Sequence, residues 1–365
     1  MTGLSCKLFK AMISPAPPFA CTYTPNVAEL LMQLNCSLAI TTFQAGKLIF
    51  LSPDGPSAMR QLPRDFNKAM GLAITQNRMA LATKEEVVVL ANAPQLAIEY
   101  PDNPYFYDAF YVPRATYYTG TVDIHDMDWD NEGKLWGVNT LFSCLVTIND
   151  EYSFQPRWMP PFITSLESVD CCHLNGMAMV DGKPRYVSMF GKTTTPKGWR
   201  NGVETSGLIM DIDTNEVVAH SLPMPHSPRW FNGQLYCLLS ATGQLIRIDV
   251  ATGKYDVITQ LKGFTRGMAK RGDYLFIGLS KLRQNASAFR DLAITKDAIY
   301  CGIEIIHLPT GAKVGHIRYE QSVEEIYDVQ VVPDFLRPGI LNHTSPKHRL
   351  ALHTPEAVFW AISQP

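Results

Sequence analysis

Three histidines stand at the same place in three successive stretches of β-rich sequence. They are His125 in "DIHDMDW", His173 in "CHLNGMA" and His226 in "PHSPRW". Each precedes a turn containing Gly or Asn and then an apolar run, so the three side chains are expected at equivalent positions of a repeated fold. Imidazoles that meet at one point can bind a divalent metal ion or move protons as acids and bases. The pattern therefore predicts one shared site.

Charged residues open the next two repeats. Arg266 lies in "FTRGMA" and Asp328 in "IYDVQV". Arg229, shortly after His226, would join Arg266 in binding an anionic group such as a carboxylate. Asp328 would act as a catalytic carboxylate, would orient a histidine, or would supply a fourth metal ligand.

Further polar residues follow the first two histidines. Asn175 lies two residues after His173, which places both on the same side of a strand. Asp126 and Asp128 closely follow His125 and would orient an imidazole or supply a fourth metal ligand, and Asp126 would also contact substrate. Three interpretations of the whole set stay open: a small-molecule site without metal, a three-histidine metal site, and polar residues that line a channel and bond to each other and to trapped water.

Familiar catalytic motifs do not decide between these interpretations. Ser227 adjoins His226, but no GxSxG elbow surrounds it, so a Ser-His hydrolase has no sequence support. The chain also contains no GxGxxG, P-loop or HExxH motif, which leaves nucleotide-binding and zincin functions without a motif.

The elements that must position these residues are short strands. In residues 225–261 the segments "PRWFN", "LYCLLS", "QLIRID" and "YDVITQL" are separated by tight turns, which is the anatomy of one β-propeller blade. The same pattern predicts further blades at 69–100, 121–158, 171–222 and 264–320. The first strand of each blade lines the central channel, so residues that open the repeats converge there.

The two ends of the chain complete one another. Residues 324–334 read as a first strand without a blade, whereas residues 37–62 read as second, third and fourth strands without a first. We therefore predict an all-β, six-bladed propeller closed by the C-terminal strand. Seven blades are the alternative, if each end forms its own blade. The expected organisation is an N-terminal arm (1–36) with one helix at 26–34, the propeller (37–342), and a C-terminal segment (343–365) packed on it.

Three insertions interrupt the repeat, at 100–118, 192–206 and 281–299. Long loops in a compact domain are more often functional, or ordered by packing, than idle. The first, "YPDNPYFYDAFYVPRATYY", is rich in aromatic residues. It is expected either to plug the outer surface of a blade or to bind a protein partner.

Composition narrows the class of protein. The chain has 365 residues, a net charge of −2 and no basic run, which argues against nucleic-acid binding. It has neither a basic amphipathic helix nor an apolar run of about 18 residues, so no membrane association is expected. The 8 cysteines include no CxxC pair. We interpret them as buried thiols of a cytoplasmic protein, and the N-terminus as mature rather than a signal peptide.

A family resemblance adds to this. The segments "VPRATYYTGTVDIHDMDWD", "CHLNGMAMVDGKPRYV", "MPHSPRWFNGQLY", "GFTRGMA" and "EIYDVQVVP" resemble, in the same order, an uncharacterised bacterial family known only as a domain of unknown function and expected to form propellers. The blade pattern is distantly similar to gluconolactonases and strictosidine-synthase-like propellers. Those lactonases hold a divalent metal with Glu, Asn and Asp, whereas this sequence has His, His, His, Arg and Asp at its blade starts.

We therefore predict an enzyme that acts on a small polar or anionic molecule by hydrolysis, elimination or isomerisation, with one divalent metal ion as a possible cofactor. The alternative is a non-catalytic propeller that binds a ligand, or a protein through residues 100–118. The candidate residues are His125, His173, His226 and Asp328 for catalysis, the three histidines for metal, and Arg229, Arg266, Asn175 and Asp126 for substrate.

Overall fold

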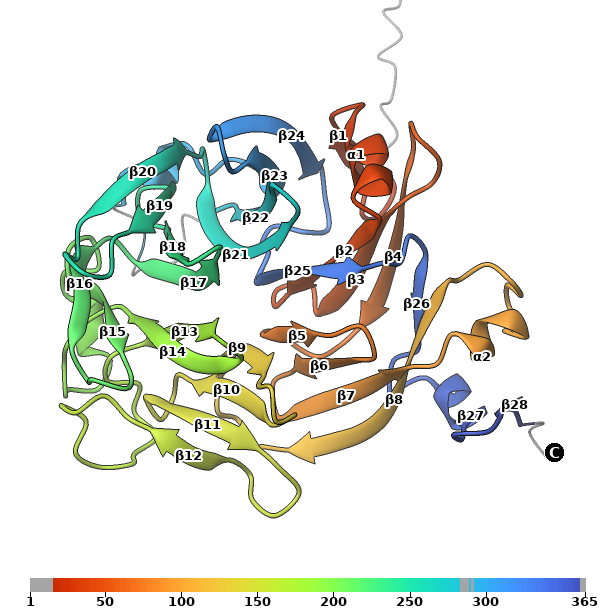
Figure 1. Ribbon diagram of the computed structural model, residues 1–365, viewed down its shortest axis with the longest axis horizontal. Helices are drawn as coiled ribbons and strands as arrows, with labels where there is room; N and C mark the ends of the chain where they lie inside the picture. The colour runs from red at the N-terminus through yellow and green to blue at the C-terminus, as the bar shows by residue number, and fades with distance from the viewer. Residues whose placement is uncertain (1–15, 283–288, 290–291, 362–365) are drawn as a thin grey trace, which may run out of the picture.

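The computed structural model describes residues 16–282, 289 and 292–361. Six sheets, each with four antiparallel strands as its main part, are arranged around a central axis (Figure 1), so the predicted six-bladed propeller is confirmed. Three blades follow the simple repeat. Their strands are β9 (Ile124–Trp129), β10 (Leu135–Asn139), β11 (Cys144–Ile148) and β12 (Gln155–Trp158); β13 (Leu174–Val180), β14 (Lys183–Met189), β15 (Gly207–Asp211) and β16 (Val217–Leu222); and β17 (Pro225–Phe231), β18 (Gln234–Leu239), β19 (Gln244–Ile248) and β20 (Tyr255–Gln260).

One blade joins the two ends of the chain. Its innermost strand is β25 (Asp328–Pro333), which pairs with β2 (Cys36–Thr42), and β3 (Lys47–Pro53) and β4 (Met59–Asp65) follow outward. The pairing runs from Cys36 opposite Pro333 to Thr41 opposite Asp328. Both ends therefore lie in one sheet, which excludes seven blades and confirms closure by the C-terminal strand.

The two remaining blades each carry a fifth strand on the outside. One contains β21 (Phe264–Arg271), β22 (Tyr274–Ser280), β23 (Cys301–His307) and β24 (Ala312–Tyr319), and β1 (Cys21–Tyr23) pairs with β24. The other contains β5 (Leu72–Ile74), β6 (Arg78–Ala82), β7 (Glu86–Asn92) and β8 (Ala109–Tyr118), and β26 (Pro338–Ile340) runs parallel to β8. These added strands cover two outer edges that would otherwise stay unpaired.

The terminal segments flank the propeller. Helix α1 (Val27–Gln33) confirms the helix predicted over 26–34, and it buries Val27 and Leu31 against β3 and β24. The C-terminal segment adds the 3₁₀ turn η3 (Pro346–Arg349) and a hairpin of β27 (Ala351–His353) and β28 (Val358–Trp360). The domain boundaries at 36 and 342 stay predictions. No helix in the described ranges is long and apolar enough to cross a lipid bilayer.

One expectation about the first insertion was wrong. Residues 109–118 are not part of a loop but form β8, the fourth strand of a blade expected to end at residue 100. Phe110, Tyr111 and Val112 are almost fully buried there. The true insertion, between β7 and β8, contains the short helix α2 (Gln95–Ile98). Its Tyr100 packs against Trp360 of β28, with ring centroids 5.3 Å apart.

The inner strands of neighbouring blades approach so closely that some positions require glycine. Gly267 of β21 has φ +77°, and a Cβ there would lie 2.5 Å from the backbone nitrogen of Val329 on β25. Gly233, in the turn between β17 and β18, has a similar φ of +75° but open space around it. The two glycines therefore share the backbone requirement and differ in the steric one.

We expect Gly233→Ala to lower the free energy of unfolding by about 1–2 kcal/mol, the cost of a left-handed conformation. Gly267→Ala should cost about 1–3 kcal/mol more, because the added methyl group collides with the neighbouring blade. Urea denaturation of both variants measures the difference. Equal destabilisation would show that the contact between β21 and β25 tolerates a side chain.

Candidate functional site

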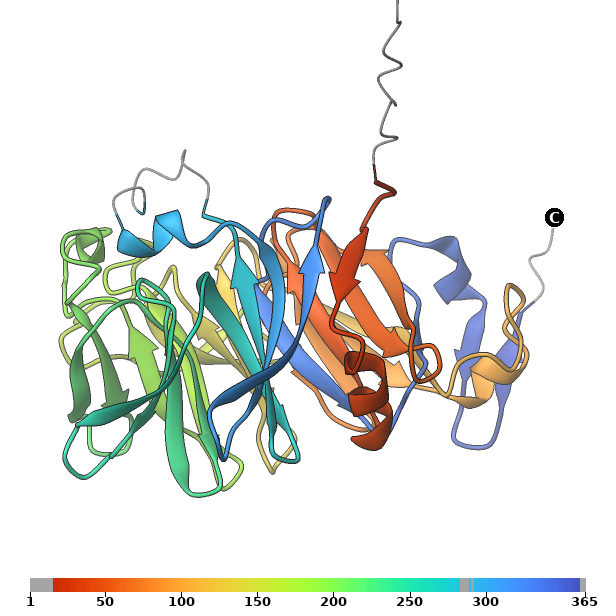
Figure 2. The ribbon, with the colours of Figure 1, turned by 90° about the horizontal axis from the view of Figure 1, so that it is seen from above.

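A cavity of about 580 Å³ lies at one end of the central channel. Its walls come from the loops that lead into the inner strands and from two insertions. The segments with η1 (Gly198–Arg200) and η2 (Ala293–Lys296) lie on the same side of the ring, at the top of Figure 2. The lining residues are Asp123, His125, Asp170, His173, Phe190, Lys197, Trp199, Arg200, Met224, His226, Phe264, Arg266, Ser280, Lys281, Leu282, Phe289, Glu324 and Glu325.

All three predicted histidines line this cavity. The rings of His125 and His173 meet edge to face, with centroids 5.0 Å apart. Phe190 lies 4.5 Å from the His173 ring and 5.1 Å from the His226 ring. The structure thus brings the three imidazoles to one cavity, with Phe190 beside two of them.

Two of the histidines are held by backbone carbonyls. His125 Nδ1 lies 3.0 Å from the carbonyl oxygen of Asp123, and His226 Nδ1 lies 3.1 Å from that of Met224. Asp123 and Met224 both have positive φ, which turns each carbonyl toward the ring two residues later. A carbonyl can only accept, so Nδ1 carries the hydrogen and Nε2 keeps its lone pair.

The same two imidazoles are neutral at neutral pH. Burial first, and then the positive charge of Arg266, lower the pKa of His125 and of His226 well below the usual 6.5. His226 also contacts Ser240, whose Oγ lies 2.6 Å from Nδ1 and donates to the carbonyl of Thr265. Both rings can therefore accept a hydrogen bond at Nε2.

His173 is held by a carboxylate instead. Its Nδ1 lies 3.1 Å from Asp170 Oδ2, and its backbone nitrogen donates to Asp170 Oδ1 at 3.0 Å. Trp199 Nε1 donates to Oδ2 of the same carboxylate at 3.0 Å. A carboxylate in this position fixes the imidazole orientation and stabilises its protonated form. Asp170 and His173 therefore form a pair suited to proton transfer.

The structure gives the predicted three-histidine metal site no support. In the described ranges, no group of three or more His, Cys, Asp or Glu side chains is placed to hold a metal ion. The Nδ1 atoms of all three histidines face protein oxygens, so only the Nε2 atoms would be left to bind a metal. The metal site therefore stays a prediction.

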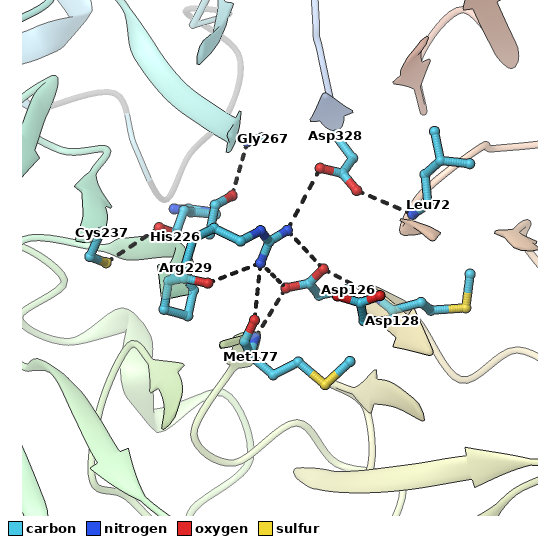
Figure 3. A network of polar contacts seen from close by, with 12 residues as sticks. Leu72, Asp126, Asp128, Met177, His226, Arg229, Cys237, Gly267 and Asp328 are labelled. Atoms are coloured by element: carbon cyan, nitrogen blue, oxygen red, sulfur yellow. Dashed lines mark hydrogen bonds and ion pairs between the residues drawn. The ribbon is translucent and has the colours of Figure 1, made fainter. Parts of the chain in front are cut away.

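The other predicted residues, apart from Arg266, lie deeper in the channel. Arg229 binds Asp126 with two hydrogen bonds, Nη1 to Oδ2 at 2.7 Å and Nη2 to Oδ1 at 3.1 Å (Figure 3). Nη1 also donates to the carbonyl of Met177, and Nη2 lies 4.0 Å from Asp328 Oδ1. The Arg229 guanidinium thus meets protein oxygens on several sides and joins its own blade to three others.

Asp328 and Asp128 are buried near this guanidinium, in surroundings of low polarity. Burial raises the pKa of Asp328 to about 7 and that of Asp128 to about 6, although Arg229 opposes both changes. Asp126 lies near both carboxyl groups and adds to the rise. One guanidinium therefore balances three carboxyl groups only in part.

A second, much smaller cavity of about 10 Å³ lies between the large cavity and the residues around Arg229. His125 and Arg266 line both cavities, whereas Asn175, Asp126, Arg229 and Asp328 line only the small one. The guanidinium of Arg266 stacks on Tyr327, 3.3 Å from its ring centroid, and Nη1 lies 3.9 Å from Glu325. The predicted residues thus form two layers. The mouth layer lines the large cavity and contains the three histidines and Arg266, and the waist layer lines the small cavity and contains Asp126, Asn175, Arg229 and Asp328. His125 and Arg266 border both cavities.

Sequence reasoning missed several cavity residues. Asp170 and Trp199 are the most important, because both hold or contact His173. The signal for Asp170 was an acid shortly before a histidine in "DCCH". Trp199 was the one aromatic residue of the 192–206 insertion, and Phe264 opens the inner strand that bears Arg266.

The raised pKa values of the carboxyl groups near Arg229 can be tested through the pH dependence of stability. A carboxyl whose pKa is raised by folding destabilises the folded state as pH rises from its unfolded pKa, near 4, through its folded pKa. Asp128→Asn removes one such group and keeps the oxygen that accepts from Trp129 N. Relative to the parent protein, the variant should therefore gain about 1–3 kcal/mol of stability between pH 4 and pH 7.

Urea denaturation at pH 4.5 and 7.5 measures this gain. Asp256→Asn is the control, because Asp256 is an exposed carboxylate on β20 that pairs with Arg247. The control should show no such gain with pH. If Asp128→Asn behaves like the control, Asp128 does not share the electrostatics of the waist.

Comparison with solved structures shows the fold. A crystal structure of the nidogen/laminin complex contains a chain 11% identical to this one, with 82% of this chain and 99% of that chain covered and a TM-score of 0.50. Virginiamycin B lyase from Staphylococcus aureus, in a catalytically inactive form with quinupristin, is 11% identical over 82% of this chain and 99% of its own, at a TM-score of 0.41. A protein of unknown function from Bacteroides caccae is 8% identical over 81% and 98%, at 0.49.

The match at a TM-score of 0.50 shows a shared fold, and an identity of 11% says nothing about chemistry. No curated protein sequence matches this chain significantly. Residues 25–341, by contrast, match the family described as "Domain of unknown function (DUF4915)". That match spans both the cavity and the closing strand, and the chain belongs to this family.

Proposed function

We propose that the protein is an enzyme that carries out acid–base chemistry on a small anionic molecule bound in the mouth cavity. The observation that carries this proposal is the Asp170–His173 pair, which lines a cavity of about 580 Å³ beside two neutral imidazoles. Cavities of about 300–1,000 Å³ are typical of small-molecule sites.

His173 is the proposed base. Asp170 holds the hydrogen on Nδ1, which leaves Nε2 to take a proton from the substrate or from a water molecule. The imidazolium that forms is stabilised by the Asp170 carboxylate. The proton then returns to another substrate atom in an isomerisation, or leaves with the departing group in an elimination or hydrolysis. All three predicted reaction types therefore share this first step.

The remaining mouth residues would orient the reacting group. His125 and His226 are neutral and can accept hydrogen bonds from a hydroxyl or a water molecule at Nε2. Arg266 would stabilise negative charge on the substrate, since its cationic group borders the cavity next to His125.

The waist residues would act by positioning. Arg229 and Asp126 satisfy each other through two hydrogen bonds, which supports a role in holding the inner strands rather than in direct contact with substrate. Asp328 and Asn175 border the small cavity beneath His125, so we assign them to the support of the mouth residues.

The alternative is a propeller that binds without catalysis. It is favoured by the mutual pairing of the waist groups, which gives them a structural role. A protein partner at residues 100–118 would meet Tyr105 and Tyr118, each 78% exposed. Tyr100, Phe110 and Tyr111 are buried and would not take part.

We also propose a reducing compartment such as the cytoplasm. The seven cysteines of the described ranges are free thiols, and six of them are buried: Cys36, Cys144, Cys171, Cys172, Cys237 and Cys301. Burial raises the pKa of Cys36, Cys144 and Cys172 to about 12, so these thiols are unreactive.

The test of catalysis needs a substrate and two variants. The protein is incubated with a metabolite extract, and mass spectrometry identifies compounds that are converted. His173→Asn and Asp170→Asn should then lower kcat/KM by about 10²–10⁴-fold, the usual contribution of a general base. His220→Asn, which changes an exposed histidine on β16, should leave kcat/KM unchanged.

Circular dichroism and thermal unfolding show whether the variants are folded. Turnover that survives in both folded variants removes His173 and Asp170 from the mechanism. A compound that binds the mouth cavity and is never converted favours the non-catalytic alternative.

A further inference from the structure

Two buried side chains beside the small cavity each have a polar atom without a partner in the protein. Asn175 is 4% exposed and Tyr327 is 5% exposed, and both line this cavity. Within the described residues, neither Asn175 Nδ2 nor the Tyr327 hydroxyl group makes a hydrogen bond. A polar group that leaves water on folding without gaining a partner is costly. Two such atoms at one cavity therefore point to a bound molecule.

The Tyr327 ring is fixed by its neighbours. The guanidinium of Arg266 lies 3.3 Å from the ring centroid, and the ring of Phe43 is stacked with it at 6.1 Å between centroids. The His125 ring meets it edge to face, with centroids 5.5 Å apart. The ring cannot turn to bring its hydroxyl group to another protein atom, so a partner for this group must come from a bound molecule.

Size and charge decide which molecule suits the small cavity. A space of about 10 Å³ has room for about one water molecule. The guanidinium groups of Arg229 and Arg266 border it and disfavour a metal cation, whereas the carboxyl groups of Asp126 and Asp328 border it and disfavour a halide. The best occupant is therefore a neutral molecule that both donates and accepts hydrogen bonds.

The small cavity is also the place where the blades converge. Tyr327 directly precedes β25, and the blades of β13 and β25 lie opposite one another in the ring (Figure 1). A molecule bound here would thus reach across the channel axis. The other lining residues come from five inner strands: His125 and Asp126 from β9, Asn175 from β13, Ser227 and Arg229 from β17, Arg266 from β21, and Asp328 from β25.

We propose that the small cavity is a binding site for one water molecule, which joins opposite blades across the channel axis. The water oxygen accepts from Asn175 Nδ2, and the Tyr327 hydroxyl group shares a second hydrogen bond with it. The carboxylates of Asp126 and Asp328 are the acceptors for its hydrogens. Buried water molecules typically make about three hydrogen bonds. Asn175, which the sequence predicted to bind substrate, is then a ligand of this water, whether or not the mouth cavity is catalytic.

A high-resolution crystal structure of the full chain tests the site directly. We expect a single peak of electron density about 2.7–3.2 Å from both Asn175 Nδ2 and the Tyr327 hydroxyl oxygen. A crystal soaked in sodium bromide should show no anomalous signal at this position. A dry cavity, a peak that only one of the two side chains reaches, or bromide in its place would overturn the proposal.

Tyr327→Phe removes only the hydroxyl group and tests its hydrogen bond in solution. The equilibrium constant for unfolding should rise about fivefold, which is the net contribution of one ordinary hydrogen bond. Tyr319→Phe is the matched control, because Tyr319 is 3% exposed, its hydroxyl group also lacks a protein partner, and it lines neither cavity. The control should leave the constant unchanged or lower it. Equal effects in urea denaturation would contradict a water ligand at Tyr327.

Asn175→Leu replaces the amide by an apolar side chain of similar size. In a crystal structure of this variant, the density peak in the small cavity should be lost. A peak that persists at full strength removes Asn175 from the site. If this variant does not fold, the peak in the parent protein and the difference between Tyr327→Phe and Tyr319→Phe decide the question.

Discussion

The inner ring of this propeller depends on one buried guanidinium. Arg229 joins the Asp126 carboxylate of β9, the Met177 carbonyl of β13 and the vicinity of Asp328 on β25. Removal of one partner of a buried, hydrogen-bonded ion pair typically costs about 3–5 kcal/mol, because the other charge stays behind unpaired. Here three carboxyl groups would stay behind. The strand that closes the ring brings one of them, so closure of the chain places the Asp328 carboxyl group beside this guanidinium.

Because this ion pair fills the waist, the part of the channel that joins the blades is separate from the part that has room for a ligand. A waist filled by its own ion pair has a cavity of only about 10 Å³, too small for a substrate. The space for a ligand lies above it, where loops and insertions rather than inner strands supply most of the side chains. His125 and Arg266 border both layers and are the only predicted residues through which the charge of the waist can influence the mouth.

The sequence predicted the architecture because the repeat is local. Each hairpin has its own turn residues and apolar runs, and residues 324–334 and 37–62 were each incomplete in a way that the other supplied. Strand β8 was missed because its aromatic run contains Pro113 and is separated from β7 by an insertion, so it carries no turn at the expected distance. Contacts between blades could not be predicted from the sequence, for a different reason. Arg229 and Asp126 are 103 residues apart, and nothing in either segment says that they pair. Trp199 and Asp170 lie in segments that follow no repeat, so blade alignment could not place them.

The three histidines, which the sequence presents as equivalent, are made different by single neighbouring groups. A backbone carbonyl fixes the hydrogen of His125 and of His226 on Nδ1, and burial beside Arg266 keeps both neutral. At His173 a carboxylate takes the place of the carbonyl. A carbonyl offers only a dipole to an imidazole ring, whereas a carboxylate offers a full negative charge. In the proposed function this difference makes His173 the base and leaves His125 and His226 as hydrogen-bond acceptors, so the atom opposite Nδ1 would divide three residues that the sequence presents as equivalent.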